Sequence, residues 1–139
     1  MTTIAYRNGV MAADSLCSSG NMRAGMMRKI AKGPDGQMGG CSGSAEACQK
    51  FIEWIERGEG DCPELGEDAD GIYIDRDGRA FYVGPKAVFV PFTGEFTAVG
   101  SGEKFAMAAM HMGADAERAV EVAIALDTCS GGKIEVIRR

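Results

Sequence analysis

The chain has 139 residues, of which 45% are hydrophobic and 25% charged, and its formal net charge is −5. This length suits one domain over residues 1–139. No apolar run is long enough for a membrane span, and the excess of acidic residues argues against a surface that binds nucleic acid. The five cysteines form no C-x-x-C pair and His111 is alone, so we predict neither a metal site nor a cofactor.

The first half of the chain predicts two strand pairs and a helix. Residues 3–15 read as a hairpin around Asn8-Gly9, because both turn positions need positive φ. A second pair is expected at 26–30 and 37–42, extending the same sheet. Apolar residues at helical spacing then predict an amphipathic helix over 45–57, with Ser44 as its N-cap and Gly58 as its end.

The second half begins with a Gly-, Pro- and acid-rich stretch, 58–70, that predicts an exposed loop. Strands are expected after it at 72–74, 80–83, 87–90 and 96–99, and we predict that they form a second sheet. Two helices are expected next, at 102–112 and 115–126, and a final strand at 133–137. This order predicts an α+β domain with two stacked sheets and helices on the outer faces.

Six short segments resemble the proteasome β-type and bacterial HslV-type peptidases, and they occur in that family's order: Thr2–Ala5, Met11–Ser15, Arg28–Ile30, Ser42–Ala47, Val99–Gly102 and Asp127–Gly132. The resemblance implies an N-terminal-nucleophile (Ntn) hydrolase with a four-layer αββα sandwich. The sandwich would be truncated, because the loop at 58–70 stands where the family has a second helix.

In that family the catalytic nucleophile is an N-terminal threonine, which here would be Thr2 after removal of Met1. A threonine hydroxyl needs an adjacent base, and the free amine of the same residue can supply it. If Met1 stays attached, the Thr2 nitrogen is an amide and cannot act as a base.

The resemblance also assigns roles to other residues. Lys29 would support the alkoxide and Asp14 would hold Lys29, while the Gly43 N–H would bind the oxyanion. Ser101, Asp127 and Ser130 would orient the amine. From the residues alone, Lys29 fits a surface position and Asp14 the end of a strand. Gly43 fits a turn, and Ser101 a helix N-cap.

The resemblance further implies a pocket for the substrate's first side chain, lined by small or flexible apolar residues, namely Cys17, Met27, Ala31, Cys41 and Ala45. Each of them fits an ordinary core position equally well.

The predicted function is that of a threonine endopeptidase acting on peptides or unfolded proteins, as a homo-oligomer and with a possible ATPase unfoldase partner. Without a secretory signal at residues 1–7, the expected location is cytoplasmic. Two alternatives stay open: a catalytically silent proteasome-like binding or assembly module, and an Ntn amidohydrolase for small molecules.

Overall fold

The computed structural model describes residues 2–19 and 22–139, which form eleven strands and three helices. The strands are β1 (Thr3–Arg7), β2 (Val10–Ala13), β3 (Leu16–Ser19), β4 (Met22–Met26), β5 (Ile30–Lys32), β6 (Met38–Ser42), β7 (Asp70–Ile74), β8 (Ala80–Val83), β9 (Phe89–Phe92), β10 (Phe96–Gly100) and β11 (Glu135–Arg138). The helices are α1 (Ala45–Arg57), α2 (Glu103–His111) and α3 (Ala116–Leu126). The chain is therefore α+β, and neighbouring strands of its sheets run antiparallel over the described residues.

The first sheet has the strand order β10-β1-β2-β11. The predicted hairpin between β1 and β2 is confirmed, and its turn residues Asn8 and Gly9 have φ values of 52° and 77°. On the other side of β1, Thr3 pairs with Gly100 of β10. This pairing brings the beginning of the chain next to the turn that precedes α2.

The second sheet has the order β5-β6-β7-β8-β9. Two predictions of sheet membership were wrong: the pair β5–β6 does not extend the first sheet, and the strand predicted at 96–99 lies in the first sheet, against β1. Alternation of apolar residues indicates which face of a strand is buried, but it does not specify the neighbouring strand. Sequence pattern alone could not resolve this point.

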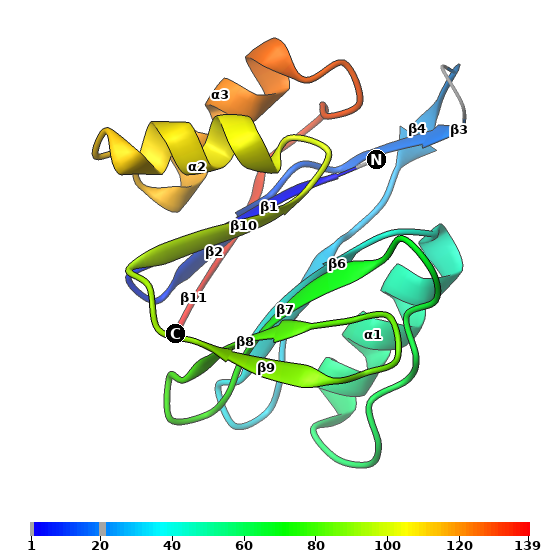
Figure 1. The fold of residues 1–139 in the computed structure, drawn as a ribbon. Coiled ribbons are helices and arrows are strands. Elements are labelled where there is room, and N and C mark those ends of the chain that lie inside the picture. Colours follow the sequence, from blue (N-terminus) through cyan, green and yellow to red (C-terminus); the bar gives the residue numbers. More distant parts are fainter. Residues whose placement is uncertain (1, 20–21) are drawn as a thin grey trace.

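The hairpin β3–β4 was not predicted. It forms a separate two-stranded sheet, and Leu16 pairs with Met26 where it leaves the body of the molecule (Figure 1). All five residues of β4 are exposed, so the sequence there lacks the apolar alternation by which a half-buried strand is recognised.

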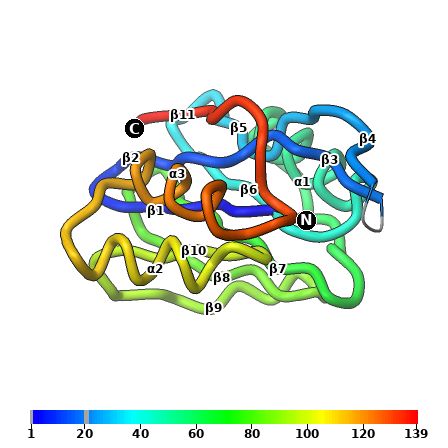
Figure 2. The backbone as a smooth tube through the Cα atoms, turned by 90° about the horizontal axis from the view of Figure 1, so that it is seen from above, coloured from blue at the N-terminus to red at the C-terminus, as the bar shows by residue number. Residues whose placement is uncertain are grey.

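The three helices of the described residues cover the outer faces of the two sheets. In Figure 1, α2 and α3 lie on the first sheet and α1 lies on the second, and Figure 2 shows the first arrangement from above. Alanines such as Ala106 and Ala119 let α2 and α3 approach their sheet closely, while Phe51 and Ile52 of α1 fill the core on the other side. None of these helices has the length and apolar character needed to span a membrane.

The two sheets face each other across a core of fully buried apolar side chains, which includes Ile4, Met11, Ile30, Met38 and Ile72. Removing such groups from water is the main favourable contribution to folding, at about 25 cal/mol per Å² of apolar surface. The packed sheets thus form a rigid support for the residues at the ends of β1, β2 and β6.

The predicted boundaries of α1 are confirmed. The Ser44 hydroxyl accepts a hydrogen bond from the Ala47 N–H, and Gly58 ends the helix with φ of 79°. The segment after it contains no helix, but it is not fully exposed as predicted. Leu65 and Ala69 are buried, and the Leu65 N–H donates to the Pro85 carbonyl, so two apolar side chains anchor this loop to the core.

Candidate active site

Thr2 lies just before β1 and is 2% exposed. Its carbonyl oxygen is 3.4 Å from the Gly102 nitrogen and 3.4 Å from the Ser101 hydroxyl. At Gly100, where φ is +105°, an added Cβ would lie 1.9 Å from the same carbonyl oxygen. The turn at 100–102 therefore fits around Thr2 only because glycine occupies this position.

The predicted ion pair between Asp14 and Lys29 is present and buried. Lys29 Nζ lies 2.9 Å from Asp14 Oδ1 and 2.7 Å from the Leu16 carbonyl oxygen, and the two charged side chains are 2% and 0% exposed. A lysine this far from water stays charged only beside such partners. The interpretation of Lys29 as a surface residue is thus wrong, whereas Asp14 does follow the end of a strand, β2.

Asp14 also organises the main chain around it. Its Oδ1 accepts from the Thr3 N–H at 2.9 Å, and its Oδ2 accepts from the Gly131 N–H at 3.0 Å. The carboxylate thereby connects β1, the beginning of the chain and the loop that follows α3. These backbone contacts were not predicted, because hydrogen bonds to main-chain N–H groups leave no residue-type signal.

Ser101, Asp127 and Ser130 lie together. Asp127 Oδ2 accepts from both serine hydroxyls at 2.6 Å, and Oδ1 accepts from the Cys129 N–H at 3.3 Å. Burial raises the pKa of Asp127, but these hydrogen bonds outweigh it and leave the pKa below its usual value. Ser101 is not the N-cap of α2, since Gly102 occupies that position.

A cavity of about 130 Å³ brings the proposed nucleophile together with its neighbours. The residues that line it are Thr2, Leu16, Cys17, Ser18, Met27, Lys29, Gly43, Ser44, Ala45 and Cys48. Gly43 has φ of 149° and stands just before α1, so the positive end of the helix dipole is directed at this cavity. An anion forming beside Thr2 would be stabilised there.

Three of the five residues predicted to line a substrate pocket lie at this cavity. Cys17, Met27 and Ala45 line the cavity, whereas Ala31 and Cys41 belong to the core between α1 and the second sheet. Both lie in the second sheet, at 2% and 0% exposure, beneath the residues that reach the cavity. Leu16, Ser18, Ser44 and Cys48 line it and were missed; the helical spacing of Cys48 indicated only that it faces inward.

Met1, whose removal the predicted mechanism requires, lies outside the described residues. Within the part of the chain that is described, no group of three or more His, Cys, Asp and Glu side chains is arranged to hold a metal ion.

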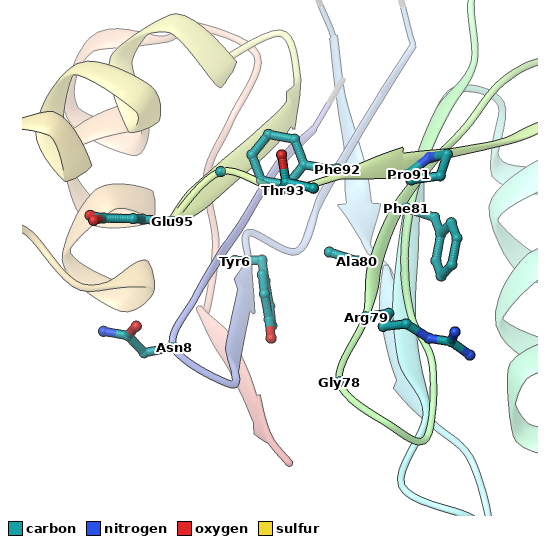
Figure 3. Close-up of a pocket in the computed structure, with 11 residues that line it drawn as sticks. Tyr6, Asn8, Gly78, Arg79, Ala80, Phe81, Pro91, Phe92, Thr93 and Glu95 are labelled. Atoms are coloured by element: carbon teal, nitrogen blue, oxygen red, sulfur yellow. The ribbon is translucent and has the colours of Figure 1, made fainter.

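A second cavity, of about 500 Å³, lies at the other end of β1. Figure 3 shows Tyr6 and Ala80 on the two sheets that border it, with Phe81 and Arg79 on the far side of β8. Its lining contains none of the predicted site residues. The larger volume is therefore separate from the cavity beside Thr2.

Comparison with known proteins gives a likeness in structure without one in sequence. No family model matches the chain, and no curated protein matches it. Thiobacillus denitrificans BPH is 19% identical with a TM-score of 0.66, over 98% of this chain and 95% of that one. BPH in complex with epoxomicin is 20% identical with a TM-score of 0.70, over 98% and 96%. The whole chain thus shares its fold with BPH.

Proposed function

We propose that this chain is a short, divergent member of the proteasome β-type and HslV-like Ntn-hydrolase family, and that it hydrolyses peptide bonds with Thr2 once Met1 is removed. On this proposal the two stacked sheets and their outer helices are a truncated four-layer αββα sandwich. The observation that carries the proposal is the single cavity shared by Thr2, Lys29 and Gly43.

The chemistry assigns one task to each group. The Thr2 amine accepts the proton of the Thr2 hydroxyl, whose oxygen attacks the carbonyl carbon of the scissile amide. The Lys29 ammonium, held by Asp14, lowers the cost of the negative charge on the attacking oxygen. The oxyanion binds at the Gly43 N–H, beside the N-terminus of α1.

The amine then returns its proton to the leaving amine, and an ester of Thr2 with the acyl part of the substrate remains. Water hydrolyses this ester with the same amine as base, which regenerates the enzyme. Ser101, Asp127 and Ser130 hold the amine in place through their connected hydrogen bonds. Each proton in the two steps therefore passes through the Thr2 amine, and the only other reactants are the substrate and water.

Peptides are the proposed substrates. Cys17, Met27 and Ala45 give the cavity apolar walls, so a charged side chain would lose hydration on entering it. The BPH structure with epoxomicin makes this compound a reasonable ligand to test on the present chain. By the same family resemblance we propose a homo-oligomer, with an ATPase unfoldase as a possible partner.

Cleavage of a peptide library tests the proposal. The Met1-free protein, prepared from a fusion cleaved just before Thr2, should cut after apolar residues, and epoxomicin should stop the reaction. Thr2→Ala and a form that retains Met1 should both be inactive. Turnover that is unchanged in Thr2→Ala, or absent from the Met1-free protein with and without candidate ATPases, would favour the silent binding module instead.

A further inference from the structure

Thr3 connects two groups of the site that otherwise do not share a residue. Its side chain is fully buried in β1, and its N–H donates to Asp14 Oδ1 at 2.9 Å. Its Oγ1 lies 2.7 Å from Ser130 Oγ. One residue next to the proposed nucleophile therefore contacts both the Asp14–Lys29 ion pair and the Ser130–Asp127 pair.

The number of hydroxyl protons decides which group donates in each of these hydrogen bonds. Ser130 has one hydroxyl proton, and the 2.6 Å contact with Asp127 Oδ2 uses it, because a carboxylate only accepts. Ser130 must then accept from Thr3. The Ser101 proton is likewise directed at Asp127 Oδ2, at 2.6 Å. Ser130 thus offers a lone pair, not a proton, to any further group, whereas the Ser101 hydroxyl also donates to the Thr2 carbonyl oxygen, 3.4 Å away.

We propose that the Thr3 hydroxyl is a positioning group: its hydrogen bond holds the Ser130 oxygen in place and occupies one of the two Ser130 lone pairs, which leaves the other lone pair for the Thr2 amine. The inference rests on the proposed function. A serine that can only accept binds the N–H groups of the amine and leaves the nitrogen lone pair directed at the Thr2 hydroxyl. Because Thr3 donates to Ser130, it also weakens Ser130 as an acceptor, so the ammonium form of the amine is less stabilised.

The position of the Thr3 hydroxyl is sterically fixed. A Cβ added at Gly102 would lie 1.9 Å from Thr3 Oγ1, so the hydroxyl occupies space that any larger residue at 102 would fill. Valine at position 3 places a methyl group against Gly102. Thr3→Ala, which only removes atoms, is therefore the second variant of the test.

The test is the pH dependence of Thr2 acylation by a β-lactone, measured in Met1-free wild type, Thr3→Val, Thr3→Ala and Thr3→Ser. Without the hydroxyl, the ammonium is more stable and the acid limb of the profile moves to higher pH. The rate on that limb should fall about three- to tenfold, the range expected for one neutral hydrogen bond. Thr3→Ser keeps a hydroxyl and should keep the wild-type midpoint.

The outcomes separate this inference from the proposed function. If wild type is not acylated at any pH, the proposed function fails. If wild type is acylated and Thr3→Val or Thr3→Ala shows the same midpoint, or a rate loss equal at all pH values, the positioning role fails alone. Thermal unfolding of each variant identifies the ones that fold, and Thr3→Ala carries the comparison if Thr3→Val does not fold.

Discussion

Lys29 is the residue at which stability and the proposed chemistry are most closely linked. It is a large, buried, charged side chain whose ammonium contacts Asp14 and the Leu16 carbonyl. Ion pairs at this depth cost desolvation energy, so replacing both partners by apolar groups can be nearly neutral for stability. A buried pair beside a cavity that also contains Thr2 is better explained by its contribution to the site.

We predict that Lys29→Met lowers the free energy of unfolding by about 3–5 kcal/mol, because it leaves the Asp14 carboxylate buried without its counter-ion. Asp14→Asn should be similarly costly. The double variant should lose clearly less than the sum of the two, as measured by urea unfolding. Additive losses would mean that the two side chains do not stabilise each other.

Asp127 gives a pH-dependent prediction. Its pKa is lower in the folded protein than its ordinary value of 3.8, since burial is outweighed by hydrogen bonds from Ser101, Ser130 and the Cys129 N–H. The ionised carboxylate therefore stabilises the fold above pH 3.8, and this contribution disappears as the pH falls through the folded pKa.

Wild type should accordingly be more stable than Asp127→Asn near neutral pH, and the difference should shrink as the pH falls below about 4. Thermal unfolding of both proteins from pH 7 to pH 3 measures it. A difference that stays constant, or grows, in acid would contradict the hydrogen-bond network described for Asp127.

The candidate site residues were predicted from a resemblance in six short segments, and the residues that this prediction missed or placed elsewhere have a common cause. Thr2, Asp14, Lys29 and Gly43 were named from the family resemblance, and the structure shows the Asp14–Lys29 ion pair and a cavity lined by Thr2, Lys29 and Gly43. Ala31 and Cys41 lie in the core and not at the cavity, and sequence could not separate the two places because small apolar side chains fit both equally well. The contacts of Thr3 and Gly131 were missed because they depend on tertiary positions.

At the level of elements, the turn between β10 and α2 determines how the beginning of the chain is held. Gly100 and Gly102 approach Thr2 and Thr3 so closely that a Cβ on either would overlap them. Local sequence signals predicted the elements on both sides of this turn, and they predicted α1 with its caps to the residue. The pairing of strands that are distant in the sequence, such as β1 with β10, was not predictable, because it depends on the whole fold.

Gly100→Ala should destabilise the protein and displace Thr2, whereas Gly113→Ala is the matched control. Gly113 has φ of +104°, nearly the +105° of Gly100, but a Cβ there would meet nothing within 4 Å. The control should lose about 1 kcal/mol from backbone strain alone, and Gly100→Ala roughly twice that or more. Equal losses, by urea unfolding, would contradict the close contact between Gly100 and Thr2.

At the scale of the whole molecule, α2 and α3 cover the first sheet but leave apolar side chains on their outer surface. Phe105, Met112, Val122 and Leu126 are exposed there, Leu126 by 60%. Apolar side chains left exposed on the two helices that cover one sheet are available for contacts with another protein. This observation supports the proposed homo-oligomer.

We therefore predict self-association of the Met1-free protein into a dimer or a closed ring. Light scattering over a range of concentrations measures it, and Leu126→Lys should weaken it because a charge would be buried in the interface. Val90→Lys, at an exposed position of β9 in the other sheet, is the control. A strict monomer at high concentration that still turns over peptide would contradict the prediction.

The central claim is that Thr2, freed of Met1, is a nucleophile. Its most direct test is the intact mass of the Met1-free protein after treatment with a β-lactone, followed by mapping of the modified residue. Mapping is essential because Cys17 and Cys48 line the same cavity. We predict one adduct per chain, located on Thr2 and absent from Thr2→Ala and from the form that retains Met1. An unmodified Met1-free protein, or an adduct located only on a cysteine, would contradict the claim.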